Sequence, residues 1–185
     1  MKIIFIRHGE THGNTEKKYI GRTDEPLCEK GIRLIQSRTY PACDIVMTSP
    51  MKRCIQTAEI IYPEVKKLVC NDLHECDFGD FEGRNYTELN GNPYYQKWID
   101  SGGTLPFPNG ESVDDFKKRC TEAFTQTVSA LPCDCTPAFV VHGGTIMAIL
   151  EKYAVPQKNY YDYMIKNGGY YLTEYDGKNL RIIGE

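Results

Sequence analysis

The first predicted strand and the residues after it, "KIIFIRHGETHGN" (residues 2–14), decide the fold of this chain. Residues 3–6 are apolar without alternation, a pattern typical of a central strand that is covered on both faces. The apolar run ends abruptly in Arg7, His8 and Gly9. A buried strand that ends in a guanidinium and an imidazole predicts a ligand site at its carboxyl end.

Strand-like and helix-like segments alternate along the rest of the chain. Runs of apolar and β-branched residues indicate strands at 44–50, 65–70, 138–144 and 170–183. Apolar periodicity and helix start signals indicate helices at 27–38, 51–62, 111–131 and 145–154. Asp176-Gly177 predicts a hairpin inside the last strand segment. This alternation predicts an α/β protein, a three-layer α/β/α sandwich with a mostly parallel central sheet.

Length and local composition bear on the domain organisation. With 185 residues, the chain is large enough for one full hydrophobic core, and we expect a single domain over residues 1–185. Residues 79–110 are rich in Gly, Pro, Asn and Tyr, so we expect a partly helical excursion over the surface there. No repeat, low-complexity tract or linker divides the chain.

Charge and cysteine content restrict the partners and the location. The formal net charge of −3 provides no basic field for nucleic acid or an anionic membrane, so we expect neither partner. No segment resembles a signal peptide or a membrane span. The eight cysteines are scattered without a Cys-x-x-Cys pair, which favours reduced thiols and a cytoplasmic location. Both a monomer and a homodimer fit these features.

The notable polar residues follow strands that should end at the same edge of the sheet. This places Arg7 and His8, after the first strand, near His142, after the fourth. Arg53 belongs to the first turn of a helix for which Ser49 is the predicted N-cap, so it lies near the positive end of that helix. Two guanidiniums and a helix N-terminus predict a site for a phosphate group.

These residue types suit phosphoryl transfer. Nearby arginines disfavour a protonated imidazole, so His8 should stay neutral and able to attack phosphorus. His142 and the arginines can donate to the oxygens on which charge gathers in the transition state. A carboxyl group is needed to protonate the leaving oxygen. The residues alone do not choose among the five that the acidic segment offers, Asp72, Glu75, Asp77, Asp80 and Glu82.

The chain contains four motifs in this order: "RHGETHGN", "SPMKRCIQTAE", "LHECDFGDFEGR" and "VVHGGTI". Together they resemble the histidine phosphatase superfamily, in its phosphoglycerate-mutase-like branch. Cys54 stands where alanine is common in that family, and Phe81 stands where tryptophan is usual. The blocks cover residues 3–146, and four of them in the right order form a specific signal.

The resemblance implies a role for individual residues. It makes His8 the phosphorylated nucleophile and Glu75 the acid and base. It makes Arg7, Arg53 and His142 residues of the phosphate pocket. It also implies phosphate or substrate contacts for Asn14, Gly21, Thr23 and Gly143. Neither a metal nor another cofactor is implied.

Within this family, "FGDFEGR" and "FPNGESVDDFKKR" look most like the α-ribazole phosphatases of cobalamin biosynthesis and related broad-specificity phosphatases. The resemblance therefore implies a metal-independent phosphomonoesterase for a small phosphorylated metabolite, with α-ribazole 5′-phosphate as one substrate. A cofactor-dependent phosphoglycerate mutase is the alternative, for which this chain has less room for a closing lid. A non-catalytic module that binds a phosphorylated ligand is disfavoured, because His8 and Glu75 are both present.

Several other residues have a plainer interpretation. Glycines flank His12, so we expect it in a loop at the pocket edge or on the surface, and we expect a structural role for His74. Glu111 is expected in the capping turn of its helix rather than against substrate. Two readings stay open for the aromatic side chains of the excursion, a stack on a substrate ring or a small core: Tyr86, Tyr94, Tyr95, Trp98 and Phe107.

Overall fold

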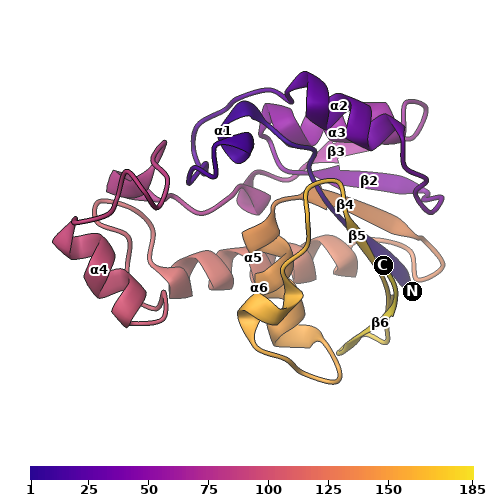
Figure 1. Cartoon of the computed structure of the whole chain (residues 1–185). Helices are drawn as coiled ribbons and strands as arrows, with labels where there is room; N and C mark the ends of the chain where they lie inside the picture. The colour runs from indigo at the N-terminus through magenta and orange to yellow at the C-terminus, as the bar shows by residue number, and fades with distance from the viewer.

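The computed structural model describes all residues, 1–185, and its centre is a six-stranded sheet in the order β3-β2-β4-β1-β5-β6 (Figure 1). The first four strands in this order are parallel, and β5 and β6 are antiparallel additions at one edge. The strands are β1 Lys2–Arg7, β2 Ile45–Thr48, β3 Lys67–Val69, β4 Pro137–Val141, β5 Tyr170–Tyr175 and β6 Leu180–Gly184. The predicted mostly parallel sheet is confirmed.

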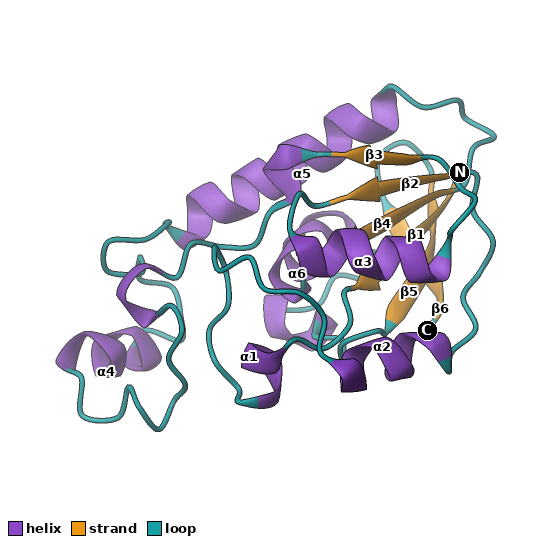
Figure 2. Ribbon diagram, turned by 90° about the horizontal axis from the view of Figure 1, so that it is seen from above, coloured by secondary structure: helices purple, strands orange, loops and turns teal.

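Helices cover both faces of this sheet (Figures 1 and 2). One face carries α2 (Glu29–Gln36) and α3 (Lys52–Ile61), and the other carries α5 (Val113–Ser129) and α6 (Gly143–Tyr153). The predicted three-layer sandwich is therefore confirmed. Two further helices lie outside the layers, α1 (His12–Thr15) and α4 (Pro93–Asp100). None of the helices has both the length and the apolar character that a membrane span needs.

The apolar run of β1 joins two cores. Ile4 and Ile6 point to the face of α3, while Ile3 and Phe5 point to the face of α5 and α6, and all four side chains are fully buried. Burying each such side chain stabilises the fold by about 1.5–3 kcal/mol relative to exposure. Because both faces of β1 are covered, its sequence shows no polar alternation.

The excursion at residues 79–110 projects from one end of the sandwich and carries α4 (Figure 1). Asn92 caps α4, since its Oδ1 accepts the N–H of Tyr94 at 2.9 Å. Beneath it, Phe81, Leu89 and Phe107 pack on Phe116 of α5 in a third buried cluster. The small core that the sequence left open therefore exists. Tyr95 and Trp98 pack against it, whereas Tyr86 and Tyr94 are exposed.

Three local predictions need correction. The loop expected around His12 is wrong, because Thr11 and Asn14 form a reciprocal capping pair that starts α1 at His12. Ser49 is not the N-cap of α3; Met51 holds that position, without a side-chain hydrogen bond. The last predicted helix begins at Gly143 rather than at residue 145.

All eight cysteines are free thiols.

Candidate active site

The carboxyl ends of β1 and β4 bring two histidines together. These strands are neighbours in parallel register, and the backbone N–H of His8 donates to the carbonyl of Val141 at 3.0 Å. The imidazole rings of His8 and His142 follow directly, with centroids 5.2 Å apart and planes inclined by 66°. Residues that are 134 positions apart in sequence (8 and 142) thus meet because two parallel strands end at one edge.

The environment of His8 defines both its charge and its tautomer. Its Nδ1 lies 2.7 Å from the carbonyl oxygen of Gly9, which can only accept, so Nδ1 carries the proton. Burial, followed by the charges of Arg53 and Arg7, holds the pKa of His8 well below its ordinary value. The ring is therefore neutral, and its Nε2 keeps a free lone pair. A buried imidazole in this state is a nucleophile.

His142 is also buried and neutral. Burial, with Arg53, His8 and Arg7 adding to it, holds the pKa of His142 well below its ordinary value. Its Nε2 lies 2.7 Å from Oγ of Ser49, and Sγ of Cys54 lies 3.6 Å from the same nitrogen. Ser49, which sequence reasoning assigned to a helix cap, instead orients this ring.

Two arginines, Arg7 and Arg53, lie beside the paired imidazole rings, and we call the space between these four side chains the arginine cup. Arg53 is fully buried, and its terminal nitrogens donate to the carbonyls of Thr23 (2.8 Å) and Gly21 (2.9 Å). Arg7 donates from Nη1 to the carbonyl of Ile165 at 2.6 Å. The Nε–H groups of both arginines are buried without a partner. Such unpaired charged donors are costly, and a bound dianion would satisfy them.

The loop at residues 21–24 is held from two sides. Arg53 donates hydrogen bonds to the carbonyls of this loop. The carboxylate of Glu82 accepts hydrogen bonds from the N–H groups of Gly21 (2.9 Å) and Thr23 (2.9 Å). These amides are therefore engaged with protein rather than directed at an open phosphate position. Gly21 lines a pocket beside Glu75, whereas Thr23 is exposed.

Of the five acidic residues that the sequence offered, Glu75 is the one whose side chain is buried. Its Oε1 accepts the N–H of Cys76 at 3.0 Å, and its Oε2 accepts the N–H of Gly144 at 3.3 Å. Burial raises the pKa of Glu75, although these N–H groups and the charges of Arg53 and Arg7 oppose part of the rise. A raised pKa favours the protonated form of this carboxyl, which suits a group that gives up a proton and later takes one back.

The start of α6 provides the close approach that this site needs. A Cβ on Gly143 would lie 3.3 Å from Nε of Arg7, and a Cβ on Gly144 would lie 2.5 Å from Oε1 of Glu75. Glycine at these two positions therefore lets a guanidinium and a carboxyl reach the helix N-terminus. That end of α6 also favours a negative charge.

Asn167, for which the sequence gives no signal, links the side chain of Asn14 to the backbone of His8. Nδ2 of Asn167 donates to the carbonyl of His8 (3.1 Å) and to Oδ1 of Asn14 (3.1 Å). Similarly, Oγ1 of Thr57 accepts the N–H of Gly9 at 3.0 Å. Thr57 lies inside a quoted motif, but nothing in the sequence around Asn167 signals its contact.

Two hollows flank Glu75. A polar one of about 610 Å³ is lined by residues that include Arg22, His74, Asp77, Glu111 and Arg119. The other, of about 680 Å³, is mostly apolar and is lined by residues that include Trp98, Phe107, Tyr160, Tyr161 and Met164. Arg7 and Gly144 also line the apolar cavity, so it opens beside the arginine cup.

The remaining histidines lie apart from the paired rings. His12 is largely exposed, and its Nε2 lies 3.0 Å from Oε1 of Glu16. His74 lines the polar hollow, and its Nδ1 lies 2.9 Å from the carbonyl of Glu75. No group of three or more His, Cys, Asp or Glu side chains is arranged to hold a metal ion.

Comparisons with known proteins identify the family of this chain. The model of the histidine phosphatase superfamily (branch 1) matches residues 3–184. The uncharacterized phosphatase PhoE of Bacillus subtilis (strain 168) is 32% identical over 156 residues, which are 81% of this chain and 76% of the relative. The adenosylcobalamin/alpha-ribazole phosphatase of Salmonella typhimurium is 27% identical over 180 residues, 91% of this chain and 87% of the relative. The crystal structure of the alpha-ribazole phosphatase from Shigella flexneri shares the fold, with a TM-score of 0.85, 23% identity and coverage of 100% and 96%.

Proposed function

The chain belongs to the histidine phosphatase superfamily and is a phosphatase, and we propose that it hydrolyses small phosphomonoesters through a phosphohistidine at His8, without a metal. One observation carries the proposal. His8 is neutral, its Nδ1 proton is engaged by the Gly9 carbonyl so that Nε2 is free, and its ring is buried within electrostatic reach of two guanidiniums whose Nε–H groups lack partners.

In the first step the phosphate dianion enters the cup and takes hydrogen bonds from Arg7 and Arg53. Nε2 of His8 attacks phosphorus, a P–N bond forms, and the bond from phosphorus to the leaving oxygen breaks. The protonated carboxyl of Glu75 gives its proton to that oxygen, so the leaving group departs as a neutral alcohol. His142 supports the charge on the equatorial oxygens.

The second step restores the enzyme. Glu75, now a carboxylate, removes a proton from a water molecule, and the water oxygen attacks phosphorus. The P–N bond breaks, inorganic phosphate is released, and His8 returns to its neutral state. One carboxyl thus serves as acid and then as base, which its raised pKa supports.

The apolar cavity supports a ring-bearing leaving group. It opens beside Glu75 and Gly144, and Trp98, Phe107 and Tyr160 provide aromatic surface. We propose α-ribazole 5′-phosphate as the substrate, since its aromatic base could occupy this cavity while its phosphate lies in the arginine cup. A polar sugar acid such as phosphoglycerate would leave the apolar surface uncovered.

Two measurements test the proposed reaction. Turnover of p-nitrophenyl phosphate should persist in EDTA. A thiophosphate monoester made chiral with oxygen isotopes and hydrolysed in isotopically labelled water should react with retention at phosphorus, since two in-line displacements restore the configuration. Inversion would indicate direct attack by water, and loss of activity in EDTA would indicate a required metal. Either result would contradict the proposed metal-independent reaction through a phosphohistidine.

The substrate is tested by comparing kcat/KM values. We expect a higher kcat/KM for α-ribazole 5′-phosphate than for 3-phosphoglycerate. We also expect no conversion of 3- to 2-phosphoglycerate in the presence of 2,3-bisphosphoglycerate. Efficient interconversion of the phosphoglycerates would replace the hydrolase with the mutase.

A further inference from the structure

Glu75 belongs to a segment that has no regular structure to hold it. Residues 74–78 lie outside every helix and strand, so no hydrogen-bonded ladder fixes them. The backbone N–H of Cys76 bonds within the segment, to Oε1 of Glu75 itself. An acid that must reach a leaving oxygen needs a position fixed to a fraction of an ångström. The support therefore has to come from residues outside this segment.

We propose that Glu111 and Arg119 form a positioning pair that holds residues 72–77, and with them the Glu75 carboxyl, against the first turn of α6. The inference rests on the acid and base role proposed for Glu75. Both members line the polar hollow beside Glu75, but their hydrogen bonds go to each other and to the backbone of residues 72–77 rather than to His8 or its arginines, so we assign them a positioning role and not a catalytic one.

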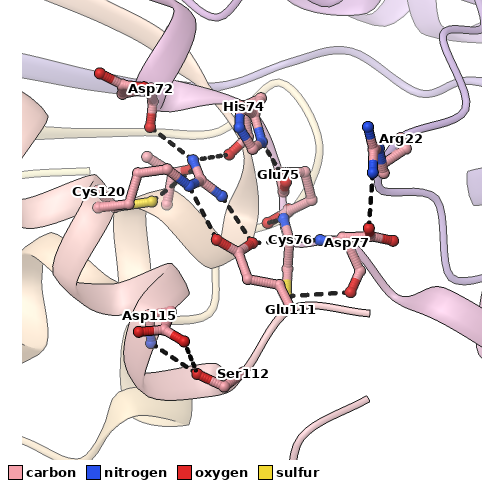
Figure 3. Close-up of polar contacts among 12 residues, drawn as sticks. Arg22, Asp72, His74, Glu75, Cys76, Asp77, Glu111, Ser112, Asp115 and Cys120 are labelled. Carbon is pink, nitrogen blue, oxygen red and sulfur yellow. Dashed lines mark hydrogen bonds and ion pairs between the residues drawn. The ribbon is translucent and has the colours of Figure 1, made fainter. Parts of the chain in front are cut away.

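Arg119 of α5 holds the segment before Glu75. Its Nη1 donates to the carbonyls of Asp72 (2.7 Å) and His74 (3.1 Å), two residues that Figure 3 labels beside Glu75. Its Nε and Nη2 form a forked pair with the two oxygens of Glu111, at 3.0 and 2.8 Å. One planar guanidinium thus satisfies two carbonyls and one carboxylate at once, which lysine cannot do.

Glu111 holds the segment after Glu75. Its backbone N–H donates to the carbonyl of Asp77 at 2.9 Å, and its Oε2 accepts the N–H of Asp77 at 3.4 Å. The expected role of Glu111 in the helix cap is wrong, since Ser112 caps α5. The pair therefore contacts the segment on both sides of Glu75, at residues 72, 74 and 77.

The ion pair between Glu111 and Arg119 is also shielded from water, which strengthens its contribution to holding the segment. The Arg119 and Glu111 side chains are only 18% and 17% exposed, whereas the ion pairs that contribute little to stability are open to water and lack this forked geometry. Breaking this pair leaves a partly buried charge and two carbonyls without donors. The segment would then relax, and Glu75 would lose its contact with Gly144.

The test uses leaving groups, because a displaced acid harms poor leaving groups more than good ones. We expect Arg119→Met to lower kcat/KM about 10²-fold for an alkyl phosphate and less than about tenfold for p-nitrophenyl phosphate. Arg119→Lys should fall between wild type and Arg119→Met, and Glu111→Gln should show the same bias more weakly. Arg181→Met, which breaks an exposed pair with Glu174 on the β5–β6 hairpin, is the matched control and should keep both values.

Background and folding controls keep the result clear. In a Glu75→Gln background, Arg119→Met should cause no further difference between the two leaving groups, because the acid is already absent. Should Arg119→Met not fold, as judged by circular dichroism, Glu111→Gln decides the question. Equal losses for both leaving groups in the folded variants would overturn the positioning role. Failure of the wild-type enzyme to hydrolyse p-nitrophenyl phosphate would instead overturn the proposed function itself.

Discussion

The substitution Gly144→Ala tests how closely the Glu75 carboxyl has to approach α6. An added Cβ would lie 2.5 Å from Oε1 of Glu75 and 3.0 Å from Cζ of Phe116. Ordinary contact begins at 3.4 Å, so the carboxyl oxygen has to withdraw by about 0.9 Å. Gly144 lies in the first turn of α6 without a positive φ, so the backbone itself accepts alanine.

The size of the effect follows from that displacement. A misplacement of about 1 Å at a reacting group can cost on the order of 10²-fold in rate. We therefore expect kcat for an alkyl phosphate to fall about 10²-fold in Gly144→Ala. The fall for p-nitrophenyl phosphate should be smaller, because its leaving group needs little protonation.

Steady-state kinetics with both substrates measures this effect. Gly184→Ala is the matched control, since a Cβ there meets its nearest atom, Cβ of Leu172, at 3.6 Å. Its kinetic constants should match those of the wild type. Unchanged kcat for the alkyl phosphate in a folded Gly144→Ala protein would refute the argument that this glycine exists to admit Glu75.

Three further outcomes are expected. Glu75→Gln should lower kcat for alkyl phosphates by about 10²–10⁴-fold and p-nitrophenyl phosphate turnover much less; equal losses would remove Glu75 from the acid role. The folded-state pKa of His8 lies below the ordinary 6.5, so the unfolded chain takes up this proton at a higher pH than the folded protein does. The free energy of unfolding should therefore decrease as the pH drops below 6.5, by up to about 1.4 kcal/mol per pH unit. The raised pKa of Glu75 contributes a slope of the opposite sign. Urea unfolding of wild type and His8→Asn across pH 5–8 isolates the His8 share, and identical slopes would contradict the lowered pKa. Trp98→Leu should raise KM for α-ribazole 5′-phosphate about 3–10-fold and leave inhibition by inorganic phosphate unchanged; a change in both would place Trp98 at the phosphate instead.

The sequence predicts the sandwich and the cluster of His8, Arg7 and His142 for the same physical reason. Continuous apolar runs identify central parallel strands, and such strands end at one edge, so the residues that follow them meet. For residues directly after a central strand, the sequence therefore predicts where the side chains lie in the fold. The choice of Glu75 among its acidic neighbours needed the family resemblance, because its segment has neither helical nor strand periodicity.

Contacts made by irregular segments could not be predicted in this way. Ser49 has the composition of a helix cap, but the ring of His142, from the neighbouring strand, lies within hydrogen-bond distance of its hydroxyl. Glu111 has the position of a first-turn acid, but Arg119 two turns later and the Asp77 backbone engage it. Asn167 reaches His8 across 159 residues of sequence. Long-range hydrogen bonds of this kind leave no periodic pattern.

Direct detection of the covalent intermediate tests the central claim. The enzyme is mixed with a ³²P-labelled phosphomonoester for a single turnover, quenched in alkali and digested, and the labelled peptide is sequenced. We predict acid-labile, alkali-stable label on the peptide that contains His8, bound to Nε2, and none in His8→Asn. Label on another side chain, or none under single-turnover conditions, would contradict the account.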